Sequence, residues 1–249
     1  MADLLRAAGA EPVVIPTIEL VEPNSLDPLD QAWERLATFH WLLFTSANAV
    51  EFLQRHLAGI GCMLCAGVPA GVKVAAIGAA TARAVEAAGL RVDHVPRQAV
   101  AESLAEELLP YAVQSDGSPS RLLLLRAEEA REVLPDTLRA AGAEVTVAPV
   151  YRNVIPVESL AAIRGLFSAR ERWPDAIAFT SSSSVTNLLA LLEAASLDLP
   201  QGVMRISIGP ITSQTLRDVR LPPDGESAEA SLAGLVAAVM EAWERREQA

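Results

Sequence analysis

The chain of 249 residues is 51% hydrophobic and 20% charged, with a formal net charge of −11 at pH 7. No apolar run approaches the ~20 residues that a membrane helix needs, and no charged segment followed by an apolar one marks a secretion signal. The acidic balance and the lack of basic runs argue against nucleic acid or an anionic membrane as partner, so we expect a cytoplasmic protein with a substantial core.

The first predicted element is a helix that ends in LRAAGAE at Leu5–Glu11, and the same seven residues return at Leu138–Glu144. Good helix formers before a glycine predict a helix end in both places. Strand-like segments follow, PVVIP after the first copy and VTVAP after the second. The second copy is preceded by the strand-like RLLLL, whereas only MADL precedes the first. We therefore expect the N-terminal unit to lack its first strand and half a helix.

Short apolar runs alternate with helical stretches between the two copies. Strands are expected at Leu42–Phe44, Val74–Ile77, Val92–Val95, Leu122–Leu125 and Val145–Ala148. Helices are expected at Ala49–Leu57, Ala80–Ala88, Val100–Leu109 and Glu129–Ala141. Continuous apolar strands with helical crossovers predict a parallel sheet covered on both faces, in an α/β fold. Ligands of such sheets bind beyond the carboxyl ends of the strands.

The repeat continues along the chain in the same order. WLLFTSANAV from Trp41 matches AIAFTSSSSV from Ala176, and VKVAAIGAATARAV from Val72 matches VMRISIGPITSQTL from Val203. AESLAEEL matches EASLAGLV further on, which pairs Ser103 with Ser231. Several collinear matches at slowly drifting offsets predict a duplicated architecture of two similar units, not a chance recurrence of helix ends.

Residues at the ends of the strands are the candidates for function. Ser and Thr in FTSANA and FTSSSS suit helix N-caps, and this structural role is the simplest interpretation. The same helix starts point free N–H groups and a positive pole beyond the strands, which suits an anionic ligand. Tyr151, in VYRNV, corresponds to Ile18 of the other half, so the phenol has no counterpart there. Packing at a domain junction and a role in a ligand site are equally compatible with this position.

Other chemistry has little support in the sequence. Cys62 and Cys65 form a single CxxC without a second one or a histidine pair, so free thiols are expected, not a metal or redox centre. The three histidines, His40, His56 and His94, have no evident Asp or Cys partner and are expected to be ordinary surface or packed residues. Motifs for dinucleotides, nucleoside triphosphates, zinc proteases and serine hydrolases are absent from the sequence.

The ordered set FTSANAV, FTSSSSV, IGAAT, IGPIT and VYRNV resembles the uroporphyrinogen-III synthase family over nearly the whole chain. The resemblance implies two flavodoxin-like domains joined by a two-stranded linker, with the chain crossing between them twice. Residues 1–17 with 156–249 would form one domain and residues 22–149 the other, and residues 18–21 with 150–155 would be the linker strands.

The resemblance also implies an activity. The family's lyases cyclise hydroxymethylbilane, a linear tetrapyrrole, with inversion of its last ring, ring D, through a spiro intermediate, and they need no metal or organic cofactor. A monomer is expected, and the upstream hydroxymethylbilane synthase is a candidate partner. The alternative is a non-catalytic two-lobed tetrapyrrole-binding, anion-binding or sensor module of the same fold.

The resemblance aligns Tyr151 with the family's catalytically sensitive tyrosine. A phenol is protonated at neutral pH and can donate a hydrogen bond to the departing hydroxyl. The substrate's eight carboxylates need short-range donors, because the protein itself is acidic. The expected substrate-binding residues are Thr45, Ser46, Ala47, Gly78, Thr81, Thr180, Ser181, Ser182, Gly209 and Thr212, many of them through backbone N–H groups.

Overall fold

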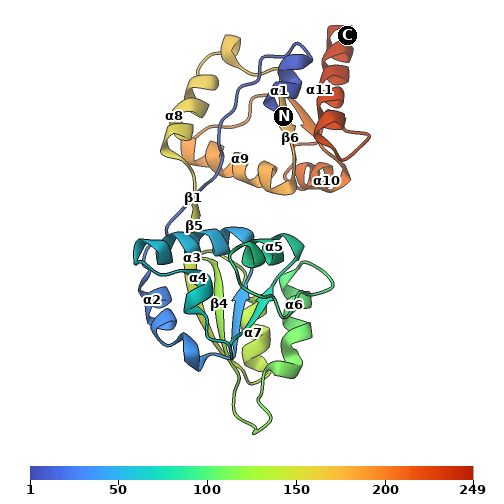
Figure 1. Cartoon of the computed structure of the whole chain (residues 1–249). Helices are drawn as coiled ribbons and strands as arrows, with labels where there is room; N and C mark the ends of the chain where they lie inside the picture. The colour runs from blue at the N-terminus through green and yellow to red at the C-terminus, as the bar shows by residue number, and fades with distance from the viewer. Residues whose placement is uncertain (249) are drawn as a thin grey trace. The chain divides into compact units, whose positions relative to one another are not determined.

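A computed structural model describes residues 1–248 of the chain. The chain divides into two compact units, which we call unit 1 (Met1–Glu19 with Val154–Ala249) and unit 2 (Leu20–Asn153). Each unit pairs parallel strands with helices, which confirms the expected α/β class with parallel sheets (Figure 1). Among the described residues no helix combines the length and apolar character required to cross a membrane.

Unit 2 is built around a five-stranded sheet with the order β1-β5-β4-β2-β3. The strands are β1 (Glu19–Val21), β2 (Trp41–Phe44), β3 (Lys73–Ala76), β4 (Arg121–Ala127) and β5 (Glu144–Val154). The helices are α2 (Asp27–Glu34), α3 (Ala47–Gly59), α4 (Leu64–Gly67), α5 (Ala79–Ala87), α6 (Ala101–Leu108) and α7 (Val133–Ala140). The pairs β2–β3, β2–β4 and β4–β5 are parallel, as the apolar runs predicted.

Alternate residues of the central strands enter different cores because successive side chains of a strand point to opposite faces. Leu42 and Phe44 pack with α2, α3, α4 and α5, whereas Trp41 and Leu43 pack with α6 and α7. Figure 1 shows the strands of unit 2 between α2 and α4 on one side and α6 and α7 on the other. The sheet is therefore buried on both faces, and its carboxyl ends remain as the place for a ligand.

Two predictions for unit 2 are wrong in detail. Val92–Val95 is not a strand: only His94 forms a bridge, to Ala75. The Asp93 carboxylate accepts the N–H of Val74 at 2.9 Å, where a regular ladder would offer a backbone carbonyl. The helix expected from Glu129 begins at Val133, because the preceding residues form a loop at the end of β4.

Unit 1 has a three-stranded sheet with the order β6-β7-β8 and parallel pairing. Its strands are β6 (Ala176–Phe179), β7 (Met204–Ser207) and β8 (Gly225–Glu226), and its helices are α1 (Ala2–Ala7), α8 (Val157–Leu166), α9 (Ser182–Ala195), α10 (Pro210–Asp218) and α11 (Leu232–Glu247). α8, α9 and α10 cover one core, and α11 covers a second core on Met204 and Ile206.

The segment PVVIP of unit 1, residues 12–16, is not a strand, contrary to the prediction. Its counterpart VTVAP belongs to β5, which pairs with β4. No strand within residues 1–248 occupies the position of β4 beside β6, so residues 12–16 have no ladder to join. Val13 and Val14 are accordingly 61% and 71% exposed. Strand propensity alone does not make a strand where a hydrogen-bonding partner is lacking.

Both copies of LRAAGAE end a helix in the same way. Gly9 and Gly142 have φ values of +88° and +97°, in the left-handed region that glycine adopts without strain. The next residue donates its N–H back over the turn in each copy, Ala10 to Leu5 and Ala143 to Leu138, both at 3.0 Å. The identical letters therefore encode one helix-stop motif, as expected.

The duplication extends to single hydrogen bonds. The Asp224 carboxylate accepts the N–H of Arg205 at 2.8 Å, just as Asp93 accepts that of Val74, and both members of the pair lie 131 residues further on. The same offset relates the first residues of α6 and α11. The expected match of Ser103 with Ser231 is therefore wrong, because Ser231 caps α11 whereas Ser103 lies inside α6.

Candidate functional site

Tyr151 lies near the carboxyl end of β5 and is 8% exposed. Its hydroxyl is 3.1 Å from Ser46 Oγ, and its ring stacks on Phe52 with the centroids 5.5 Å apart. Ser46 is the N-cap of α3 and Phe52 lies on the same helix, so α3 holds the tyrosine at both ends. A phenol fixed in this way loses little conformational freedom when it acts on a ligand.

A β-bulge gives Tyr151 its direction. The register between β4 and β5 shifts after Arg126, which pairs with Pro149, so that Ala127 pairs with Tyr151. Strict alternation would place Tyr151 on the face opposite to Val150, yet both side chains belong to the same core. Bulges turn a side chain out of the regular alternation and are frequent beside functional sites. Nothing in the local sequence around Arg126 and Tyr151 predicted this bulge.

A cavity of about 290 Å³ lies beside Tyr151 at the carboxyl ends of β2, β3, β4 and β5. Its polar lining comes from Thr45, Arg126, Glu129, Arg131, Tyr151 and Asn153. Two arginines and one glutamate lie in this lining, and each arginine also pairs with a carboxylate, Arg126 with Glu132 and Arg131 with Glu102. The cavity therefore offers guanidinium donors to a ligand without itself carrying a net positive charge.

The expected binding residues of unit 2 surround the starts of two helices. Ser46 accepts the N–H of Ala49 at 3.0 Å, so the N-cap role is real and coexists with the contact to Tyr151. The Thr45 hydroxyl donates to the Leu125 carbonyl at 3.3 Å. Ala47 is the first residue of α3 and is half-buried. Thr45 and Tyr151 line the same cavity, whereas Ser46 contacts it only through the tyrosine.

The second helix start of unit 2 is that of α5. Gly78 is its N-cap, with an extended backbone, and is buried. Thr81 is 4% exposed, so its side chain faces the core of the unit. The first turn of α5 therefore offers a ligand its backbone N–H groups, not the threonine hydroxyl.

The corresponding residues of unit 1 have a similar arrangement. Thr180 is exposed, and Ser181 caps α9 in a reciprocal capping box with Ser184. The Ser182 hydroxyl accepts a hydrogen bond from Thr215 at 2.7 Å, which links α9 to α10.

At the start of α10, Gly209 is the N-cap and Thr212 is 4% exposed, in parallel with Gly78 and Thr81. Each unit thus presents two helix starts beyond its strands, one with a serine cap and one with a glycine cap. This arrangement suits an anionic ligand in both units.

Arg126 and Arg131 are functional candidates that the sequence analysis missed. Arg126 is 7% exposed and comes directly after four consecutive leucines of β4. A charged residue at the carboxyl end of an apolar strand was the available signal. Arg131 forms an ion pair of 2.7 Å with Glu102 in the first turn of α6.

The carboxylate of Glu102 is fixed by this arrangement. Hydrogen bonding by its own backbone N–H lowers the pKa of Glu102, desolvation opposes this, and the hydrogen bond and charge of Arg131 lower the pKa further. Glu102 therefore carries its negative charge at neutral pH and keeps Arg131 at the edge of the cavity.

The histidines were expected to have no Asp or Cys partner, and this is wrong for His56. His56 Nε2 lies 2.7 Å from an oxygen of Asp30, and His94 Nε2 lies 3.2 Å from Glu107. Neither histidine lines the cavity beside Tyr151. Asp30 and Glu107 come from neighbouring helices, so sequence spacing could not reveal these pairs.

Metal-binding residues do not converge in the described part of the chain, where no cluster holds three or more His, Cys, Asp or Glu side chains. Cys62 is half-buried, Cys65 is exposed, and both are free thiols.

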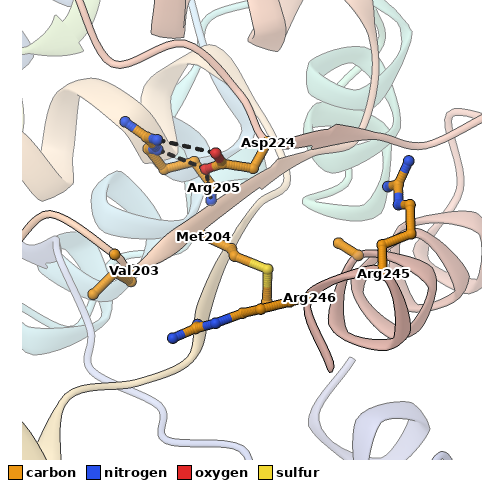
Figure 2. A pocket seen from close by; sticks show the side chains of 8 residues that line it. Val203, Met204, Arg205, Asp224, Arg245 and Arg246 are labelled. Carbon is orange, nitrogen blue, oxygen red and sulfur yellow. Dashed lines mark hydrogen bonds and ion pairs between the residues drawn. The ribbon is translucent and has the colours of Figure 1, made fainter. Parts of the chain in front are cut away.

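A second hollow, of about 380 Å³, lies in unit 1 between β7 and α11 (Figure 2). The Arg205–Asp224 ion pair closes one side of it at 2.9 Å. Figure 2 shows the Arg245 and Arg246 side chains pointing in different directions, not toward a common point. The hollow lies at the amino end of β7, where ligands of parallel sheets do not ordinarily bind.

Comparison with known proteins points to one family. Residues 1–237 match the sequence profile described as uroporphyrinogen-III synthase HemD. The chain is 36% identical over 248 residues to the uroporphyrinogen-III synthase of Synechococcus elongatus, covering 97% of this chain and 89% of the relative. It is 34% identical over 225 residues to a putative uroporphyrinogen-III synthase of Methanothermobacter thermautotrophicus, covering 87% and 83%.

Solved structures agree in fold. A mutant uroporphyrinogen III synthase from Thermus thermophilus superposes with a TM-score of 0.63 at 23% identity, covering 98% of this chain and 94% of that one. The uroporphyrinogen-III synthetase of Helicobacter pylori gives a TM-score of 0.57 at 21% identity, with 94% and 93% covered. At these identities the likeness concerns the mixed α/β fold alone.

Proposed function

The chain belongs to the uroporphyrinogen-III synthase family, and we propose that it is a lyase that cyclises hydroxymethylbilane to uroporphyrinogen III with inversion of ring D. The observation that carries the proposal is the position of Tyr151. It is a buried phenol, held at both ends by α3, on the wall of a cavity that two arginines line at the carboxyl ends of the strands. The family resemblance had singled out the same residue.

The contact between Ser46 and Tyr151 can work in one useful direction. One lone pair of Ser46 Oγ accepts the N–H of Ala49, and its own proton is free to be donated. If Ser46 donates to the tyrosine oxygen, the phenolic proton is free to be donated to a ligand.

The reaction needs this acid at its first step. The terminal hydroxyl of hydroxymethylbilane leaves with a proton supplied by Tyr151, as water, and the ring that carried it becomes an electrophilic azafulvene. The substituted position of ring D then attacks, forming the new carbon–carbon bond of a spiro intermediate. The old bond to ring D breaks, the ring recloses in reversed orientation, and the return of a proton to the Tyr151 oxygen restores both the pyrrole and the phenol. The net change is the loss of one water.

The protein's second task is to hold the linear substrate in a productive shape. The same substrate closes without help to the isomer with ring D not inverted, so positioning matters as much as proton transfer. We propose that the substrate carboxylates bind at the four helix starts, α3 and α5 in unit 2 and α9 and α10 in unit 1. Thr81 and Thr212 would take part through their backbone N–H groups, because their side chains are buried.

The finer architecture is part of the proposal. The two units would be flavodoxin-like domains bounded near residues 1–17 with 156–249 and residues 22–149, with residues 18–21 and 150–155 as linker strands. The division of the described chain at Glu19/Leu20 and Asn153/Val154 supports these boundaries. The protein would act as a cytoplasmic monomer without a cofactor and would receive its substrate from hydroxymethylbilane synthase.

The alternative, a non-catalytic tetrapyrrole-binding or anion-binding module, is not favoured by the named relatives. One assay separates the two functions. Freshly made hydroxymethylbilane is incubated with the protein, and the I and III isomers are separated after oxidation. The enzyme should give isomer III in proportion to its concentration. A binding module would slow closure or leave only isomer I, and that result would refute the proposed function.

A further inference from the structure

Arg126 is a buried charge at the carboxyl end of β4. It is 7% exposed and lies on the wall of the cavity that also exposes Tyr151. Moving a guanidinium out of water is costly unless its donors find acceptors. The hydrogen-bond partners of Arg126 therefore show whether the protein itself satisfies all the donors of this guanidinium.

The partners of Arg126 are incomplete. Nη1 donates to the Arg131 carbonyl at 3.1 Å, and Nη2 contacts the carboxylate of Glu132. Nε is buried and has no hydrogen-bond partner among residues 1–248. The side chain of Glu132 is 52% exposed, so the single compensating carboxylate lies largely in solvent. A buried guanidinium with a free donor and one exposed partner has capacity for a further anion.

The surroundings favour a carboxylate as that anion. The cavity has a volume of about 290 Å³ and holds a second arginine, Arg131, which is positioned by Glu102. Arginine binds a carboxylate with two parallel hydrogen bonds, which fixes direction as well as distance. Thr45 and Tyr151 also line this cavity.

We infer that Arg126 binds one carboxylate side chain of the tetrapyrrole in the cavity beside Tyr151 and thereby sets the position of the reacting ring against the phenol. This inference rests on the proposed function for the identity of the ligand. Neither the resemblance nor the expected binding residues, which are uncharged, include this arginine. Arg126 would provide a strong, directional contact where the helix starts provide weak and diffuse ones.

A purely structural role is the rival explanation. Arg126 could serve only to hold the loop at residues 128–132 through Arg131 and Glu132. In that case removal of Glu132 should act like removal of Arg126, because both break the same contact. If Arg126 binds the ligand, removal of Glu132 should leave binding unchanged or strengthen it, because the competing carboxylate is gone.

The test measures equilibrium binding of uroporphyrin III, the stable oxidised form of the product, by porphyrin fluorescence, so that it does not depend on turnover. We expect Arg126→Gln to weaken binding about 10- to 100-fold, the usual size for a charge-assisted contact. Glu132→Gln should bind as well as the wild type or better. Arg205→Gln, which removes an arginine of unit 1 that is also paired with a carboxylate, is the matched control and should bind normally.

The inference is overturned if folded Arg126→Gln binds like the wild type, if Glu132→Gln weakens binding as much as Arg126→Gln, or if the wild type binds no porphyrin. Should Arg126→Gln not fold, Arg126→Lys decides: a several-fold loss supports the two-pronged contact and wild-type affinity refutes it. A wild type that binds through Arg126 but yields only isomer I would refute the proposed function and leave the binding role intact.

Discussion

The side-chain oxygens of Tyr151 and Ser46 lie 3.1 Å apart, although 105 residues separate them in the chain. One belongs to a bulged strand and the other caps the helix that begins beside it. Because the serine also accepts the Ala49 N–H, its position is fixed by the fold before any ligand arrives. Ser46 therefore has two roles, because it caps α3 of unit 2 and also orients the phenol of Tyr151.

Replacement of Tyr151 by Phe should lower turnover about 10²- to 10⁴-fold, because a general acid is typically worth that factor. The ring would still stack on Phe52, so thermal unfolding should change little. The measurement is the initial rate of isomer III formation at saturating substrate. Formation of isomer III at the wild-type rate would remove Tyr151 from the mechanism.

Replacement of Ser46 by Ala should affect both stability and turnover. Loss of an N-cap costs about 0.5–2 kcal/mol in the free energy of unfolding. Turnover should fall about 3- to 30-fold, since removal of one net hydrogen bond to the phenol is worth roughly 1 kcal/mol or more. Ser231→Ala removes the cap of α11, which accepts the Gly234 N–H at 3.0 Å, and serves as the control. It should lower stability by a similar amount with normal turnover, whereas equal turnover in both variants would argue against a role for Ser46 in catalysis.

Gly78→Ala and Gly209→Ala should differ although the two glycines are equivalent N-caps. A Cβ at position 78 would lie 2.7 Å from the Cβ of Ala99, whereas at position 209 the nearest atom, of Ala230, is 3.9 Å away. Overpacking typically costs about 1–3 kcal/mol, so the first variant should unfold at a lower temperature and the second should resemble the wild type. Calorimetry of both variants checks this, and similar melting temperatures would contradict it.

Arg131→Gln should raise the pKa of Glu102 toward the ordinary value of 4.5, because Arg131 contributes to lowering it. A carboxyl whose pKa is lowered on folding stabilises the protein above its unfolded pKa, and that contribution is lost as the pH falls through the folded value. The variant should therefore lose less stability than the wild type between about pH 5 and 3. NMR titration of the Glu102 side chain measures the shift directly. Glu107, whose pKa is lowered first by the Arg97 N–H, should titrate unchanged in the variant.

The fold was largely predictable because its strands are continuous apolar runs between helices. Leu42–Phe44 and Leu122–Leu125 lie inside β2 and β4, as expected. The failures concern edges of sheets. Val92–Val95 and residues 12–16 have the composition of strands, but a strand also needs a neighbouring strand to which its backbone can bond. In the first segment the Asp93 side chain accepts a hydrogen bond in place of a backbone carbonyl. Beside the second segment no described strand is present. Such information belongs to the tertiary structure and not to local sequence.

The site was predictable in outline only. Tyr151 was singled out because one half of the duplicated chain carries a phenol and the other half carries Ile18. The bulge that orients it and the serine that contacts it depend on strand register and on residues distant in sequence. Arg126 was missed because, after four leucines, it resembled the end of a strand, and only its burial shows that the charge is enclosed.

The three-stranded sheet of unit 1 leaves β6 at an edge, bonded to β7 alone among the described strands, and three of its four residues are only partly buried. The equivalent strand of unit 2, β2, has neighbours on both sides, and all four of its residues are buried. In deuterated water the amides of β6 should therefore exchange long before those of β2. The sheet of unit 1 would then unfold locally many times in the period in which the sheet of unit 2, which carries Tyr151, stays folded.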